Sequence, residues 1–174
     1  MSRAEGAAFF MSSLLDIDAF RDACAQFATG VAIATVLAPD GSPHGLTVSS
    51  FTSVSLQPPL ILICIDYACS IISYFKNDCN FAVNILNDAQ RELSVRFSIK
   101  PEGRFEGVEW YSGLSGTPLI PDSLVQFECT VEQMIGAGDH AVLIGRVLKV
   151  VSKSGRPLLY FNRTYRNVVQ LADI

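Results

Sequence analysis

The sequence has few charged residues, only two histidines and no long hydrophobic run. Charged residues make up 17% of the 174 positions, against about 25% in typical soluble domains. Two histidines cannot form a multi-histidine metal cluster, and we expect no metal site. The apolar stretches fall well short of the roughly 20 residues that cross a bilayer. We therefore expect a soluble protein that has no membrane partner.

The cysteines give no sign of a covalent framework. They number five, an odd count, and no two of them form a C-x-x-C pair. A disulfide scaffold or a zinc site therefore has little support, and reduced thiols in the cytoplasm are the simpler interpretation. Near the N-terminus, Glu5 lies in the region that is positive in signal peptides, and Ser12 and Ser13 break the apolar run, which disfavours a secretory signal.

The net charge is slightly acidic, but the basic residues are unevenly distributed. The 13 basic and 17 acidic residues give a net charge of −4, which disfavours a nucleic-acid partner. Residues 146–166 nevertheless contain six bases and no acid. These bases indicate one of two arrangements. They form a site for cofactor phosphates, or they are the outward-facing residues of a terminal strand and its tail. Because 49% of the residues are apolar, disorder is excluded, and the low charge content favours burial in a homo-oligomer.

The chain length corresponds to one domain. We assign residues 1–15 to a flexible N-terminal extension and residues 16–174 to the folded domain. Near the start of that domain, apolar residues recur at helical spacing and predict a short helix that ends at Gly30. The residues of this stripe are Ile17, Phe20, Cys24 and Phe27.

Short strands outnumber helices in the rest of the chain. Apolar and β-branched runs bounded by glycine and proline turns predict strands. These runs span residues 31–37, 44–48, 60–65, 81–86, 125–135, 140–151 and 158–161. A second amphipathic helix is predicted over residues 88–97, with Asp88 as its cap. The pattern predicts a mainly β protein, an antiparallel and nearly closed barrel with short flanking helices.

Three segments combine residue types that suit a ligand. Residues 47–55 hold six hydroxyl side chains, which suit a phosphate ester or simply the solvated face of a strand. The sequence Gly138-Asp139-His140 places a histidine after a glycine turn, where it either orients a carboxamide, stabilises charge on a redox ring or is structural. Residues 159–166 alternate aromatic residues with arginines, which suits a planar phosphorylated ligand or a dimer-edge strand.

Nucleotide-binding fingerprints are absent from the sequence. There is no P-loop, and Gly136-Ala137-Gly138 lies between predicted strands rather than at the start of a helix. The glycines at 136–138 are therefore not the fingerprint of a Rossmann-type nucleotide-binding site.

Taken together, these segments resemble the short-chain flavin reductase family, the small reductase components of two-component flavin-dependent monooxygenases. The resemblance covers roughly residues 20–166 and depends on the order and spacing of several short stretches. These are FATGV at 27–31, HGLTVSSFTSVS at 44–55, QPPL at 57–60, FAVNIL at 81–86, QREL at 90–93, RF at 104–105, GDH at 138–140 and YF at 160–161.

The resemblance implies an antiparallel Greek-key split β-barrel, the FMN-binding split barrel, which forms a homodimer with flavin at the subunit interface. It implies oxidation of NADH or NADPH with reduction of FMN or FAD, and a transient oxygenase partner that consumes the reduced flavin. It also implies that His140 is the catalytic residue beside the nicotinamide. The implied cofactor-binding residues are Thr47, Val48, Ser49, Ser50, Phe51, Asp66, Tyr67, Ser70, Arg104, Gly138, Asp139, His140, Phe161, Arg163 and Tyr165.

Other functions are compatible with the same fold. One is a tightly bound FMN electron-transfer flavoprotein that does not itself oxidise NADH or NADPH. Another is a flavin-bound reductase whose acceptor is a metal or corrinoid complex, and a third is a non-enzymatic barrel that binds an apolar ligand. The sequence leaves open FMN against FAD and NADH against NADPH.

Overall fold

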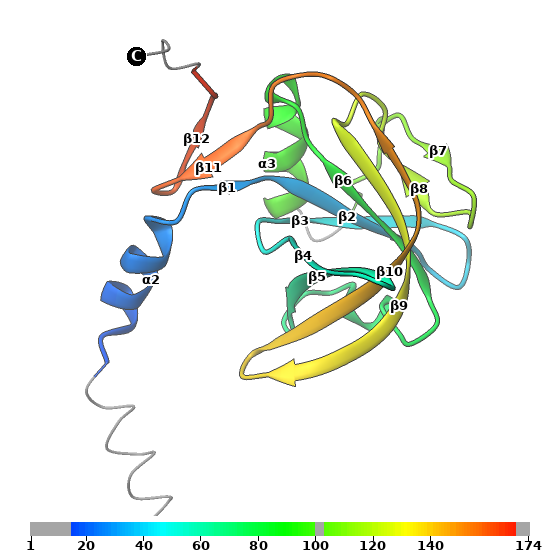
Figure 1. Ribbon diagram of the computed structural model, residues 1–174, viewed down its shortest axis with the longest axis horizontal. Coiled ribbons are helices and arrows are strands. Elements are labelled where there is room, and N and C mark those ends of the chain that lie inside the picture. The colour runs from blue at the N-terminus through cyan, green and yellow to red at the C-terminus, as the bar shows by residue number, and fades with distance from the viewer. Residues whose placement is uncertain (1–14, 100–102, 170–174) are drawn as a thin grey trace, which may run out of the picture.

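The computed structural model describes residues 15–99 and 103–169, and antiparallel strands dominate it (Figure 1). The extension expected for residues 1–15 lies outside the described residues except for Leu15. The largest sheet has seven strands in the order β3-β2-β6-β9-β10-β5-β4. Its strands are β2 (Ala32–Leu37), β3 (Pro43–Val48), β4 (Thr52–Leu56), β5 (Pro59–Asp66), β6 (Asn80–Ile85), β9 (Val125–Ala137) and β10 (His140–Ser152).

Smaller elements flank this sheet. A three-stranded sheet has the order β1-β11-β12, with β1 at Thr29–Gly30, β11 at Leu159–Phe161 and β12 at Thr164–Arg166. A two-stranded sheet pairs β7 (Tyr111–Ser112) with β8 (Pro118–Leu119). The helical segments are α2 (Ile17–Ala25), η1 (Ile72–Tyr74), η2 (Asp88–Gln90) and α3 (Arg91–Ile99). No helix in the described ranges has both the length and the apolar character needed to cross a membrane.

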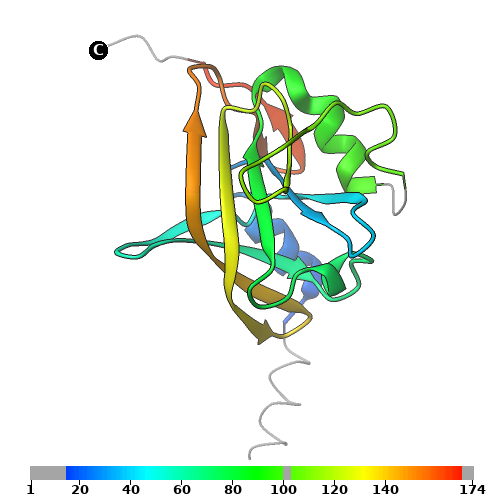
Figure 2. The same ribbon diagram turned by 90° about the vertical axis from the view of Figure 1, so that its right-hand side faces the viewer.

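The seven-stranded sheet closes into a barrel because β3, at one end of the strand order, contacts β5 near the other end. Figure 2 shows the long β9–β10 hairpin running along one side of the barrel. Alternate residues of each strand point inward, so that Ile63, Phe81 and Leu143 are fully buried in the barrel core. The predicted antiparallel barrel with short flanking helices is confirmed.

Two glycines allow close packing inside this barrel. A Cβ built on Gly145 of β10 lies 2.8 Å from Cε1 of Phe81, a fully buried ring on β6. A Cβ on Gly45 of β3 lies 2.9 Å from Cε1 of Phe97 on α3. Both positions therefore need hydrogen in place of a side chain, Gly145 for the barrel core and Gly45 for the contact between barrel and helix.

A second core holds α3 against the outer face of the barrel. Phe97 packs there with Ile33 of β2 and with Leu158, just before β11. Helix formation begins one residue earlier than predicted, because Asn87 rather than Asp88 is the cap. The Asn87 side chain accepts a hydrogen bond from the Ala89 N–H, and Gln90 completes a capping box.

The first helix differs from its prediction in two ways. It ends at Ala25 with Gln26 as its cap, whereas Gly30 lies in β1 and pairs with Leu159 of β11. No residue of α2 is buried, and Figure 1 shows the helix standing apart from the barrel. The apolar stripe of α2 is therefore real, but nothing in the described part of this single chain covers it.

Candidate functional site

The end of the β9–β10 hairpin meets the end of β5 around His140. Gly138 has φ of +63°, a left-handed conformation that glycine adopts without strain and that allows this tight turn. His140 lies opposite Asp66 of β5 in the strand register, and the N–H of Tyr67 donates to the carbonyl of Asp139 at 3.0 Å. The fold thus brings together five of the predicted site residues from two separate segments: Asp66, Tyr67, Gly138, Asp139 and His140.

The hydrogen bond between Asp139 and His140 has a defined donor and acceptor. The Oδ1 atom of Asp139 lies 2.7 Å from Nδ1 of His140, and this hydrogen bond lowers the pKa of the Asp139 carboxyl below its usual value. An ionised carboxylate only accepts hydrogen bonds, so Nδ1 must be the atom that donates. The Nε2 atom of the half-exposed imidazole is then the one left to meet a ligand.

A second group of predicted residues lines a cavity of about 210 Å³ between the end of β3, α3 and the terminal hairpin. Thr47 and Ser49 contribute from β3 and the turn after it, and Tyr165 contributes from β12. Thr47 Oγ1 donates to the carbonyl of Ser94 at 2.7 Å, and the Tyr165 hydroxyl lies 2.8 Å from Ser94 Oγ. These hydrogen bonds fix two walls of a cavity that presents hydroxyl groups to its interior.

Other members of the hydroxyl-rich segment have structural contacts. Ser50 Oγ accepts from the N–H of Cys64 at 2.8 Å and lies 3.2 Å from the Cys64 carbonyl, so it ties the turn after β3 to β5. Val48 is buried in the barrel core. Phe51 is half-buried, and its ring centroid is 5.4 Å from that of Phe127.

The remaining predicted residues are dispersed. Arg104 Nη1 donates to the carbonyl of Gly45 at 2.7 Å, and Ser70 is exposed after β5. Phe161, at the end of β11, is half-buried. Arg163 lies in the turn between β11 and β12 and forms an ion pair with Asp22 at 2.7 Å.

The basic stretch at 146–166 is largely neutralised by distant acids. Five of its six bases lie within 4.0 Å of a carboxylate. The pairs are Arg146–Glu132, Lys149–Glu128, Lys153–Asp122, Arg156–Asp88 and Arg163–Asp22. The interpretation of the whole stretch as a phosphate site is therefore not supported, because most of its charge is already balanced.

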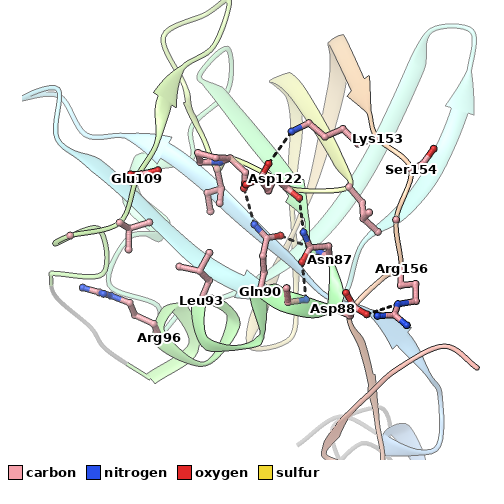
Figure 3. Close-up of a pocket in the computed structure, with 17 residues that line it drawn as sticks. Asn87, Asp88, Gln90, Leu93, Arg96, Glu109, Asp122, Lys153, Ser154 and Arg156 are labelled. Carbon is pink, nitrogen blue, oxygen red and sulfur yellow. Dashed lines mark hydrogen bonds and ion pairs between the residues drawn. The ribbon is translucent and has the colours of Figure 1, made fainter.

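A larger cavity of about 690 Å³ lies elsewhere, beside the start of α3 (Figure 3). Its polar side chains bond mainly to one another and to nearby carbonyls. Lys153 pairs with Asp122, Arg156 pairs with Asp88, and Gln90 Nε2 donates to the Pro121 carbonyl. None of the predicted site residues lines it, so its size does not make it the candidate site.

The site residues predicted from the sequence leave out four that line the hydroxyl-lined cavity, namely Val31, Ser94, Ser98 and Tyr160, although Tyr160 belongs to the aromatic segment 159–166 noted above. The two serines stand four apart within the predicted 88–97 helix and its continuation, and therefore share one face of α3. That spacing was the available signal. Nothing in the sequence indicated that this face would meet Thr47.

Comparison with known proteins gives a consistent result. Residues 24–169 match the family model described as Flavin reductase like domain. A protein named Probable flavin reductase from Rhizobium meliloti (strain 1021) is 40% identical over 78% of this chain, which spans 44% of that relative. The reductase subunit HsaB of a flavin-dependent monooxygenase from Mycobacterium tuberculosis is 34% identical, with 91% of this chain and 86% of the relative covered.

A solved structure shares the fold along almost the whole chain. The NADH:FAD oxidoreductase SgcE6 of Streptomyces globisporus, in complex with NAD and FAD fragments, superimposes with a TM-score of 0.85 at 31% identity. The match covers 91% of this chain and 96% of that one.

Proposed function

The chain belongs to the family of the flavin reductase like domain, and from this premise we propose that it is an NAD(P)H:flavin oxidoreductase. It would pass a hydride from NADH or NADPH to FMN or FAD and deliver the reduced flavin to a separate monooxygenase. A relative named as the reductase subunit of a flavin-dependent monooxygenase supports the last part.

The observation that carries this proposal is the hydroxyl-lined cavity. Residues far apart in the sequence, Thr47, Ser94 and Tyr165, meet there and are fixed by mutual hydrogen bonds. A flavin offers a phosphate, ribityl hydroxyls and a flat ring, and hydroxyl groups beside tyrosine rings suit all three. The residues present therefore fit part of a flavin. Ser49 would bond to its polar chain and Tyr165 would lie beside it. Thr47, whose hydrogen already bonds to the Ser94 carbonyl, would accept from a ribityl hydroxyl.

The protein's contribution would be positioning. When bound, the flavin supplies the acceptor for the hydride of the nicotinamide, and a solvent proton balances the reaction. His140, held by Asp139 through Nδ1, would use Nε2 to orient the nicotinamide carboxamide. Tyr67 and Asp66 adjoin His140 and would border the same ligand. No side chain has to act as a nucleophile.

We expect Ser49→Ala to weaken FMN binding roughly tenfold, the usual effect of removing a hydrogen bond to a charged group. Ser50→Ala is the matched comparison, because its hydroxyl is already bonded to Cys64. That variant should lose stability, by roughly 1–2 kcal/mol. FMN titration followed by fluorescence quenching and urea unfolding separate the two effects. Wild-type FMN affinity in Ser49→Ala would contradict the assigned role.

The outer face of the barrel supports a homodimer. Val142 of β10 lies between Cys64 of β5 and Ile135 of β9, and the next outward residue, Ile144, lies beside Leu62. Their neighbours Ile63 and Leu143 point into the core, so this apolar row faces outward. Antiparallel sheets usually place polar residues on a solvated face. We infer that a second copy of the chain covers this row, as the low charge content also suggests.

We expect the wild-type protein to sediment at twice its 18.9 kDa chain mass and Val142→Asp to sediment as a single chain. An aspartate in the covered apolar row would lose its hydration without gaining a partner. Analytical ultracentrifugation measures both species, and Ser112→Asp, on the exposed strand β7, serves as the control. A monomeric wild type, or a dimeric Val142→Asp variant, would contradict the proposed dimer interface.

The decisive experiment measures NADH and NADPH oxidation with FMN, FAD and riboflavin, with and without added flavin. Free flavin that behaves as a saturable substrate supports the proposed reductase. Flavin that stays bound while no NADH is consumed supports an electron-transfer flavoprotein instead. Flavin that stays bound while a metal or corrinoid acceptor is consumed supports the other reductase class.

A cytoplasmic location is part of the same proposal. All five cysteines are unpaired thiols, which suits a reducing compartment. NADH and NADPH are available there, and the proposed oxygenase partner would be reached by diffusion of reduced flavin.

A further inference from the structure

A third cavity, of about 450 Å³, lies between the first turn of α3 and strand β12. Tyr165 belongs to the walls of both this cavity and the hydroxyl-lined one. The other polar side chains around it are Asp88, Arg91, Thr164, Arg166 and Asn167. We call it the arginine cavity.

The first guanidinium of the arginine cavity is held in place by an aromatic ring. The guanidinium carbon of Arg91 lies 5.5 Å from the centroid of the Tyr165 ring, within the range of a cation–π contact. The Tyr165 ring is itself fixed, since its hydroxyl bonds to Ser94 and the ring makes an edge-to-face contact with Tyr160 at a centroid distance of 5.2 Å. Arg91 is therefore preorganised, which reduces the entropy lost when it binds a ligand.

The arginine cavity keeps a net positive charge. Its one carboxylate, Asp88, is already paired with Arg156 at 2.8 Å. Within residues 15–99 and 103–169, neither Arg91 nor Arg166 has a carboxylate within ion-pair distance. Arg163, by contrast, is neutralised by Asp22. Two guanidiniums are thus left facing a cavity that also presents a hydroxyl and an amide.

We propose that the arginine cavity binds a phosphate monoester carried by a planar ring system. The inference rests on the proposed function, which supplies two sources of such a monoester. These are the 5′-phosphate of FMN and the 2′-phosphate of NADPH. A phosphate monoester carries about −1.5 to −2 charges at neutral pH, whereas each phosphate of a diester linkage carries one. Arginine forks bind phosphate oxygens in pairs. The cavity therefore favours FMN over FAD and riboflavin, or NADPH over NADH.

The test compares phosphorylated and unphosphorylated ligands by isothermal titration calorimetry at fixed ionic strength. The probes are FMN against riboflavin, and adenosine 2′-monophosphate against adenosine. We expect Arg91→Gln and Arg166→Gln each to weaken one monoester roughly tenfold or more, and to leave its unphosphorylated counterpart unchanged. Arg146→Gln, which also removes an exposed arginine but on β10, is the control and should bind all four probes as the wild type does. Thermal melting confirms that each variant is folded.

The outcomes identify the source of the phosphate. A loss confined to FMN assigns the cavity to the flavin, and a loss confined to adenosine 2′-monophosphate assigns it to the dinucleotide. Equal affinities for a monoester and its unphosphorylated partner, or losses that are the same in Arg146→Gln, overturn the proposal. NADH oxidation with saturating riboflavin tests the proposed function separately, because riboflavin has no phosphate and should support turnover in both arginine variants.

Discussion

Replacing His140 by alanine is expected to lower kcat/KM for NADH or NADPH on the order of 100-fold, while the affinity for flavin stays near the wild-type value. The hydrogen bond between His140 Nδ1 and Asp139, 2.7 Å long, orients the imidazole and leaves Nε2 for the proposed contact with the nicotinamide. Without that group the nicotinamide loses its orientation, and a displacement of about 1 Å at the reacting atoms costs a factor of this size. The proposed flavin contacts lie mainly in the separate hydroxyl-lined cavity, so we expect them to survive.

Stopped-flow reduction of bound flavin at a series of NADH concentrations measures this effect directly. The other histidine provides a matched control, because His44 lies near the start of β3 with its ring tilted against that of Tyr74 at a centroid distance of 4.8 Å. His44→Ala should reduce flavin at the wild-type rate. A His140→Ala variant with unchanged rates across the NADH series would rule out the proposed role.

The largest expected effect on stability comes from Gly145→Ala, which should destabilise the fold by roughly 1–3 kcal/mol, as overpacked cores do. The new methyl group would lie 2.8 Å from Cε1 of Phe81 and closer still to its Cζ atom. Phe81 is fully buried and makes a ring contact with Phe75 at 6.1 Å, so it has little room to move. Equilibrium urea unfolding measures the change.

A second substitution tests whether the clash with Phe81 is the cause of the lost stability. Phe81→Leu removes the atoms that collide with the new methyl group, so the double variant should lose less stability than the sum of the two single losses. Gly30→Ala is the matched control, because a Cβ there meets no atom within 4 Å. Strictly additive losses in the double variant would show that Gly145 is needed for another reason.

The strands and their hairpins follow well from local patterns. The turn residues 38–43 and 136–139 each separate two apolar runs, and both became hairpins, β2–β3 and β9–β10. Turn chemistry and alternation act over a few residues, so a single sequence carries them in full. The grouping of Asp139 and His140 was equally local, because the two residues are adjacent.

Contacts between residues far apart in the sequence could not be predicted from local patterns. The bases at 146–166 looked available for phosphates, but Arg163 pairs with Asp22 and Lys149 pairs with Glu128, and only the folded chain brings these partners together. The helix at Ile17–Ala25 has the periodicity of a buried helix, yet none of its residues is buried. Periodicity reveals an apolar face and leaves unspecified whether the same chain covers it.

The strands β1-β11-β12 form a small sheet of their own beside the seven-stranded barrel, to which Leu158 ties it through backbone hydrogen bonds with Val31 and Leu86. This small sheet supplies Tyr160 and Tyr165 to the hydroxyl-lined cavity, and Tyr165 with Arg166 to the arginine cavity. Mutations in this terminal hairpin can therefore remodel both cavities without breaking a barrel hydrogen bond. Substitutions in this hairpin are therefore expected to change the proposed cofactor contacts while the β5–β10 and β9–β10 pairings that hold His140 stay intact.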